Sequence, residues 1–363
     1  MTGKETIRAM LRGQKPERLA WAPCIDPYTQ SGLPEELRRL DIFALQHHFG
    51  SDMFRGGCAY GERLDASVRH TQQTLAGGRV LDVYATPRGE LREVHTFVPE
   101  SPYIPFPTEH LIKTFADLDL YVDLVERTEI VPDDTRLREA IAAYPGAMVT
   151  SSLCDTPLPE LMTKLIGTDT FVYMHQEDPG RMRRAMEVMQ AKHRKQVATS
   201  VRSPAELFIC YENTNTASFG VRWINEYELP WLDEYADLVH GAGRHLLVHM
   251  CGRIQRVVPR IAHGRFDGII DVAPPPTGDC DIPAAVEALA AQGKLLGGGI
   301  ECNTFTLTDP EAFARRTAAL VASIAGRTNF LLGSGDAVPQ GTSEANLLRA
   351  AAIAKSTPMP GRR

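Results

Sequence analysis

Eight short apolar runs of β-type residues recur along this chain, and most are followed by a loop and a segment with helical periodicity. Apolar strands that alternate with helices are typical of a parallel sheet whose faces are covered by helices. Eight such units within 363 residues fit an α/β fold, the closed (β/α)8 TIM barrel. The expected strands cover residues 19–25, 52–57, 146–152, 206–212, 244–250, 266–272, 294–300 and 329–335.

The insertion between the second and third expected strands contains "VLDVYATPRGELREVHTF" (80–97). Its two alternating runs flank a Pro/Gly turn, which predicts a β-hairpin insertion at the mouth of the barrel. No Gly/Ser-rich linker or low-complexity tract interrupts the chain, so residues 1–363 are predicted to form a single domain. We expect the last residues, "STPMPGRR" (356–363), to be a frayed tail.

The composition is that of a globular protein, with 43% hydrophobic and 23% charged residues. A net charge of -6 argues against a nucleic-acid partner. No apolar stretch is long enough for a membrane span, and the charged first residues do not resemble a signal peptide. The seven cysteines are odd in number and irregularly spaced, which does not fit a disulfide framework. We therefore expect a cytoplasmic protein with no membrane association.

The stretch "HLLVHMCGRI" (245–254) reads as a buried strand that ends in a histidine and a cysteine. Side chains alternate across a strand, so His249 and Cys251 share a face. An imidazole and a thiolate presented together resemble half of a zinc site, and a thiolate favours zinc over magnesium or calcium. The structural alternative is a core histidine beside a buried cysteine.

Barrel enzymes carry their chemistry on the loops that follow the strands, and polar side chains gather at those positions here. Cys302 is a candidate third metal ligand, Asp336 competes with it, and Glu212 is a candidate fourth. Other polar residues at strand ends are expected to line the pocket: Asp26, Tyr211, Asn213, Asp271 and Glu301. An acid at such a position can instead cap the next helix.

Three stretches, "HLLVHMCGRI", "GGGIECNTF" and "LLGSGDAVPQGTSEANLLRA", resemble the uroporphyrinogen decarboxylase superfamily. Within it they resemble the zinc-dependent, corrinoid-linked methyltransferase branch. The resemblance covers nearly the whole chain and is sharpest from Glu206 onward. The decarboxylases proper carry an Arg-Gln-Ala-Gly-Arg type motif after the first strand, which grips the carboxylates of the substrate. Here that place reads "PCIDPYTQSGLP", without arginine, which argues against porphyrinogen decarboxylation.

The methyltransferase branch uses a His-x-Cys pair and a later cysteine as zinc ligands, and His249 and Cys251 match the pair. In the glycine-rich loop "GSGD" (333–336), Asp336 stands where the later cysteine is expected. The resemblance thus implies a zinc ion whose third ligand is either Asp336 or Cys302.

The implied activity is that of a zinc-dependent methyltransferase of the O-demethylase type. It would move a methyl group from a small methylated compound, expected to carry that methyl in a methoxy group, to a corrinoid protein, or from a methyl-corrinoid to a thiol. Glu212 or Asp271 would protonate the departing oxygen. The cobalamin would be carried on a separate protein, because "DLVHGAG" (237–243) has the wrong spacing for a corrinoid signature.

Members of this superfamily often pair as dimers, so a homodimer is also implied. The alternative function is that of a metal-independent decarboxylase or lyase that acts on a small acid. Metal content distinguishes the two, because only the first requires zinc.

Overall fold

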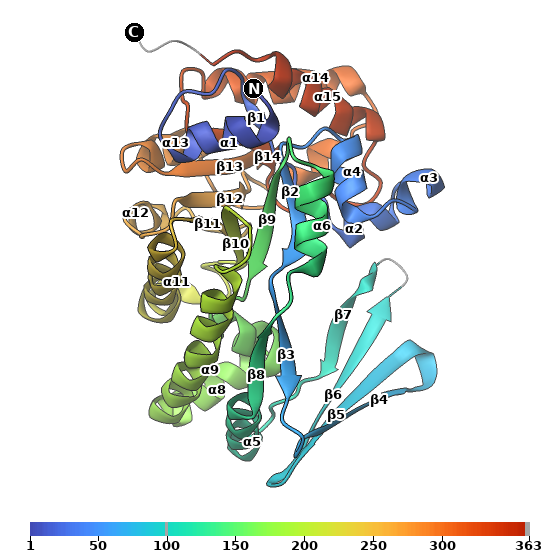
Figure 1. Ribbon diagram of the computed structural model, residues 1–363, viewed down its shortest axis with the longest axis vertical. Helices are drawn as coiled ribbons and strands as arrows, with labels where there is room; N and C mark the ends of the chain where they lie inside the picture. The colour runs from blue at the N-terminus through green and yellow to red at the C-terminus, as the bar shows by residue number, and fades with distance from the viewer. Residues whose placement is uncertain (99–100, 360–363) are drawn as a thin grey trace. The chain divides into compact units, whose positions relative to one another are not determined.

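The computed structural model describes residues 1–98 and 101–359, and the chain divides into two compact units (Figure 1). Unit 1 comprises three segments, Met1–Ala59, Asp134–Leu153 and Val201–Arg363. Unit 2 comprises two, Tyr60–Asp133 and Cys154–Ser200. The single domain expected over the whole chain stays a prediction.

Unit 1 is an α/β barrel of eight parallel strands in the order β1-β14-β13-β12-β11-β10-β9-β2. The predicted TIM-barrel fold is confirmed, since each strand falls on one of the eight expected runs. The two ends of the sheet are joined by a backbone hydrogen bond of 2.7 Å from Asp52 to Trp21. The strands are β1 (Ala20–Trp21), β2 (Met53–Cys58), β9 (Met148–Leu153), β10 (Leu207–Tyr211), β11 (His245–His249), β12 (Gly268–Val272), β13 (Leu295–Ile300) and β14 (Phe330–Ser334).

The interior of the barrel is filled by apolar side chains from all eight strands, together with Ile7 and Met10 of the first helix. Burial of this kind is the main stabilising contribution to such a fold. The helices of unit 1 are α1 (Gly3–Leu11), α2 (Pro27–Ser31), α3 (Glu35–Arg38), α4 (Ile42–His48), α6 (Thr135–Ala143), α10 (Gly220–Trp223), α11 (Leu229–Gly241), α12 (Val258–Ala262), α13 (Ile282–Ala290), α14 (Pro310–Ser323) and α15 (Glu344–Ser356). Short turns η3 (Ile224–Glu228), of π type, and η4 (Cys302–Thr306), of 3-10 type, complete it.

Unit 2 contains two antiparallel sheets. One pairs β3 (Tyr60–Leu64) with β8 (Thr128–Pro132), and the other has the order β4-β5-β6-β7. Its strands are β4 (Arg69–Thr74), β5 (Arg79–Thr86), β6 (Gly89–Val98) and β7 (Ser101–Glu109). Its helical segments are α5 (Phe115–Glu126), α7 (Pro157–Pro159), η2 (Glu160–Leu165), α8 (Thr168–Glu177) and α9 (Pro179–Ser200), with a short turn η1 (Ala76–Gly78).

The hairpin expected over residues 80–97 falls on β5 and β6, which pair antiparallel from Arg79 with Thr96 to Thr86 with Gly89. The other strands of unit 2 were not anticipated from the sequence. β4 is exposed at every position, so it lacks the apolar alternation that reveals a strand.

The end of the chain was expected to fray over residues 356–363. Thr357 and Met359 instead form backbone hydrogen bonds with Leu19 and Glu17, of 3.0 and 3.2 Å. Residues 360–363 of the expected tail lie outside the described residues.

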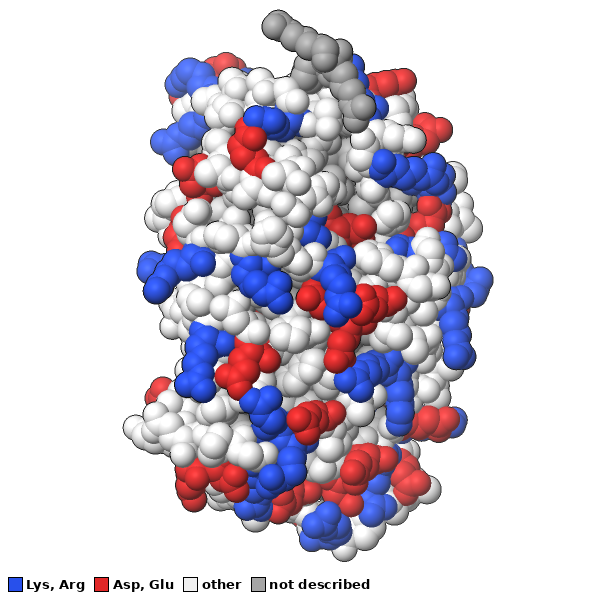
Figure 2. Space-filling model, turned by 90° about the vertical axis from the view of Figure 1, so that its left-hand side faces the viewer, with Lys and Arg blue, Asp and Glu red and all other residues white. Residues whose placement is uncertain are grey.

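The surface carries charges of both signs. On the described part of the face drawn in Figure 2, Lys and Arg side chains are interspersed with Asp and Glu, and neither sign dominates. Among the described helices, none combines the length and the apolar character that a bilayer crossing requires.

Candidate metal centre

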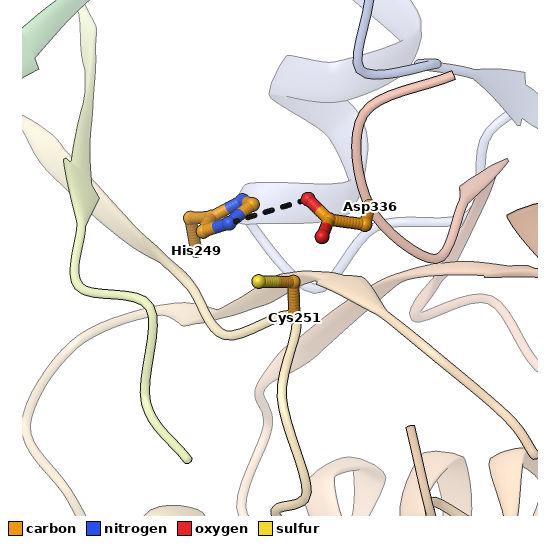
Figure 3. A group of neighbouring side chains, drawn as sticks. All are labelled: His249, Cys251 and Asp336. Carbon is orange, nitrogen blue, oxygen red and sulfur yellow. Dashed lines mark ion pairs between the residues drawn. The ribbon is translucent and has the colours of Figure 1, made fainter. Parts of the chain in front are cut away.

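Three side chains from two strand ends converge at the mouth of the barrel. His249 is the last residue of β11, Cys251 follows it by two, and Asp336 lies in the loop after β14. Each offers one ligand atom, and these atoms all lie within 4.8 Å of one another. Figure 3 shows the three side chains pointing toward one another. The same-face relation expected for His249 and Cys251 therefore holds in the structure.

Two glycines allow this convergence. A Cβ at Gly252 would lie 2.4 Å from the carbonyl oxygen of Thr214, so the loop after Cys251 can pass the loop after β10 only without a side chain. A Cβ at Gly335 would lie 2.7 Å from Cα of Ala273. The glycines beside the candidate metal ligands thus allow close backbone approach on both loops.

The imidazole of His249 is oriented by a buried carboxylate. Its Nδ1 lies 2.7 Å from Oδ2 of Asp271 and donates to that oxygen. The opposite nitrogen, Nε2, lies 3.8 Å from Oδ1 of Asp336. Metal-binding histidines typically donate their second nitrogen to a carboxylate in this way, which fixes the tautomer and the ring. The ring of His249 is therefore oriented with Nε2, the nitrogen available to a metal, toward Cys251 and Asp336.

Asp271 is held in turn by Arg55, which the sequence analysis did not identify. Arg55 Nη1 and Nη2 donate to the two carboxylate oxygens of Asp271 at 2.6 and 2.9 Å, and both side chains are buried. The side-chain amide of Gln46 in α4 exchanges two hydrogen bonds of 2.7 Å with the backbone of Arg55. The only sequence signal was an arginine inside an apolar strand.

Both members of this ion pair lie at irregularities in their strands. The register of β2 with β9 shifts between Phe54 and Gly57, around Arg55. The register of β12 with β13 shifts between Ile269 and Val272, and Asp271 has a φ of 63°. Such bulges redirect a side chain that regular alternation would aim elsewhere. Regular strand patterns therefore do not predict this pair.

The charges of the site are strongly coupled. Burial opposes a charged imidazole at His249, but nearby Cys251 and Asp271 outweigh it and hold the pKa of His249 well above its ordinary value. Burial also opposes ionisation of Asp271, but Arg55 and His249 outweigh it and lower the pKa of that carboxyl. Asp271 is thus an anion at neutral pH. This state does not suit the proton donor expected from the sequence, and it suits the orientation of His249.

The two candidate third ligands differ in position. Asp336 belongs to the convergent group of described residues, whereas Cys302 does not. Cys302 is buried, and burial raises the pKa of its thiol to about 12. Asp336 is therefore the candidate third ligand that lies with His249 and Cys251.

Residues at the end of β10 and just after it lie beside the candidate metal-binding group. The Tyr211 ring lies 5.5 Å from the His249 ring, and Oδ1 of Asn213 accepts from the Cys251 thiol at 3.7 Å. Asn213 has a φ of 52°, a strained conformation for a residue with a side chain. Glu212 is fully buried, with the Cys210 thiol 3.5 Å from its Oε2.

Two expected pocket residues have local structural roles. Asp26 caps α2, where Oδ1 accepts from the backbone N–H of Thr29 at 2.8 Å. Burial raises the pKa of Asp26. Glu301 accepts from the Thr277 hydroxyl at 2.6 Å and from the Asn303 amide at 2.9 Å. The capping alternative thus describes the contacts of Asp26 in this structure.

A sequence model of one protein family matches residues 100–356, the model described as uroporphyrinogen decarboxylase (URO-D). The match covers well over half of the chain. The chain belongs to the uroporphyrinogen decarboxylase family. A comparison with curated proteins finds none that matches this sequence.

Two solved structures were compared with this chain, both at low sequence identity. A methyltransferase from Methanosarcina mazei superposes with a TM-score of 0.64 and 12% identity, over 98% of each chain. A Listeria monocytogenes protein described as a vitamin-B12-independent methionine synthase gives a TM-score of 0.40 and 10% identity, over 93% of this chain and 95% of that one. The first of these likenesses supports the barrel fold.

Proposed function

We propose that this protein is a zinc-dependent methyltransferase that transfers a methyl group between a small molecule and the cobalamin of a separate corrinoid protein. The observation that carries the proposal is the convergence of His249, Cys251 and Asp336, with Asp271 orienting the imidazole. The Methanosarcina mazei methyltransferase shares the fold and supports the same class of reaction.

The donor set fits zinc. Nitrogen, sulfur and oxygen ligands in a group of three are typical of catalytic zinc sites, which keep the fourth position open. His249, Cys251 and Asp336 would hold the ion, and Asp271 would fix the tautomer of His249. When bound, zinc would act as a Lewis acid on the oxygen or sulfur of the small molecule.

The single thiolate favours an oxygen-bound substrate. A carboxylate at position 336 donates less charge than the cysteine expected there, so it leaves a bound metal more electrophilic. The proposed direction of transfer is therefore demethylation of a methoxylated compound. In this transfer the carbon–oxygen bond of the methoxy group would break, and the oxygen would keep the bonding electrons and take up a proton. The methyl group would bond to the corrinoid through an electron pair supplied by cobalt(I).

Glu212 is the proposed source of that proton. It is fully buried one residue beyond β10, the strand whose last residue, Tyr211, packs beside His249. Burial of a carboxyl group favours its neutral, proton-donating form. Asp271 cannot share this role while it is paired with Arg55, because the pair keeps it ionised.

Two measurements on the purified chain test the proposal. Elemental analysis should show that Cys251→Ala lowers the zinc content by one equivalent while the fold is retained. Methyl transfer from a panel of methoxylated aromatic compounds to free cob(I)alamin should require that equivalent. A variant series in which the zinc content never depends on Cys251, or activity that survives its loss, contradicts the proposal and favours a metal-independent lyase.

A further inference from the structure

We propose a second metal site in unit 2, on one face of the β4-β5-β6-β7 sheet, that takes a divalent transition-metal ion. Its ligands are Asp82 on β5 and Glu93 and His95 on β6. Each offers one ligand atom, and these atoms all lie within 4.8 Å of one another. The site is independent of the barrel and of the proposed methyltransferase function.

The sheet register places these side chains together. Asp82 pairs directly with Glu93 across β5 and β6, so both side chains point to the same face. His95 lies two residues beyond Glu93 and shares that face. Regular antiparallel pairing therefore supplies three ligands from two neighbouring strands, without a flexible loop.

Two further residues support Asp82 from β4. Nε2 of His70 donates to Oδ1 of Asp82 at 2.7 Å, and the Gln72 amide lies 3.2 Å from the same oxygen. The His70 ring stacks on the ring of Tyr84, with centroids 4.4 Å apart and planes 8° from parallel. Supporting hydrogen bonds of this kind hold a ligating carboxylate in place.

The charge of the cluster favours a cation. Asp82 is buried with 7% exposure, and the side chain of Glu93 is only 12% exposed. Among the ion pairs of the described residues, both carboxylates pair with histidines and neither pairs with a lysine or an arginine. Burying carboxylate charge without a permanent cation is unfavourable. A divalent ion offsets both charges at once.

The donor types select the metal. Imidazole with carboxylate suits zinc and other divalent transition metals, whereas magnesium and calcium prefer oxygen ligands alone. Nδ1 of His95 lies 3.8 Å from Asp82, and its Nε2 lies 3.6 Å from Glu93. Ligands of a tetrahedral zinc ion lie roughly 3.5 Å apart, so small side-chain movements bring the three into range. A bound ion would join β5 directly to β6 and, through His70, to the exposed strand β4.

Zinc binding by the full chain tests the site. The background is Cys251→Ala/Asp336→Asn, which lacks two of the three barrel ligands. After loading with zinc and desalting at neutral pH, this protein should hold one equivalent by elemental analysis. Adding His95→Gln should remove that equivalent, and adding His70→Gln should weaken binding without abolishing it. The matched control Glu90→Gln changes an exposed carboxylate of β6 and should leave the equivalent in place.

The absorption spectrum of bound cobalt(II) distinguishes the site in unit 2 from the barrel site. The site in unit 2 contains no sulfur, so it should give no thiolate charge-transfer band, unlike the Cys251 site. Circular dichroism without metal should show that each variant is folded. If His95→Gln does not fold, Glu93→Gln takes its place in the test. In the competing arrangement, a protonated His95 pairs with both Asp82 and Glu93, and the cluster binds no metal ion. The proposal is overturned if the Cys251→Ala/Asp336→Asn protein holds no zinc. It is also overturned if that protein keeps its zinc after His95→Gln or Glu93→Gln is added.

Discussion

Arg55 and Asp271 form a bidentate ion pair inside the barrel, although 216 residues separate them in the chain. Asp271 uses the same carboxylate to orient His249. The arginine is therefore linked to the proposed metal site through one intermediate, and its loss would affect both the fold and the site.

Arg55→Ala should destabilise the barrel strongly. It leaves the Asp271 carboxylate buried without its cation, which typically costs about 3–5 kcal/mol in the free energy of unfolding. Guanidinium titration measures this change. The control Arg349→Ala breaks an ion pair with Glu311 at the surface and should cost at most about 1 kcal/mol. Similar losses in the two variants would contradict the structural role of the pair.

Asp271→Asn should weaken zinc binding at the barrel site by roughly 10- to 100-fold, because an amide cannot hold His249 in the required tautomer as firmly. Competition with a chromophoric chelator measures this affinity. His245 and Asp267 form a similar histidine–aspartate pair, with Nδ1 and Oδ1 3.1 Å apart. Asp267→Asn is therefore the matched control and should leave the zinc affinity unchanged. Equal changes in zinc affinity for the two variants would show that Asp271 has no specific role at the metal site.

Asp336→Cys should convert the ligand set to one with two thiolates. We expect tighter zinc binding and, with cobalt(II) in the site, a stronger thiolate charge-transfer band. Methyl transfer from methoxylated donors should fall, since the metal becomes less electrophilic. Asp336→Asn, by contrast, should lower the affinity. A cobalt spectrum that does not change with Asp336→Cys would show that residue 336 does not bind the metal.

Stability should fall in acid because of one buried pair in unit 2. Burial opposes ionisation of Glu160, but the adjacent charge of His193 outweighs it and lowers the pKa of Glu160 to about 2. Relative to its ordinary value of 4.5, the stabilisation is present in full above pH 4.5 and is lost as the pH falls toward 2. The amount is roughly 3 kcal/mol.

Urea unfolding between pH 2 and 5 measures this loss, with signals from unit 2 followed by hydrogen exchange. Glu160→Gln should be less stable at neutral pH and should show a flatter dependence on pH in this range. An identical slope in the variant and the parent chain would assign the acid sensitivity to other groups.

The fold of the barrel was predictable because its strands are continuous apolar runs. The expected strands at 244–250 and 294–300 differ from β11 and β13 by at most one residue at either end. The closeness of His249 to Cys251 was also predictable, since a spacing of two in a strand fixes a common face. These inferences use only local periodicity.

Features that depend on distant partners were not predictable. Arg55 finds its carboxylate far along the chain, and both residues lie where strand alternation is broken. The sequence analysis could name Asp271 as polar and near the site, but not its partner, and so assigned it a proton-donating role. In unit 2, β4 was missed because its residues are polar on both faces. The structure of such segments depends on contacts with residues that are distant in the sequence.

The pairing of β1 with β14 determines when this protein can finish folding. Ala20 pairs in register with Leu331, so the first strand has to wait until residues more than 300 positions later have left the ribosome. Every residue of unit 2 precedes Val201 and can emerge well before that point. Contacts so distant in sequence slow the search for the native state, and the early strands remain exposed to aggregation in the meantime. Synthesis and chaperone protection during this interval therefore matter more for the barrel than for the unit inserted into it.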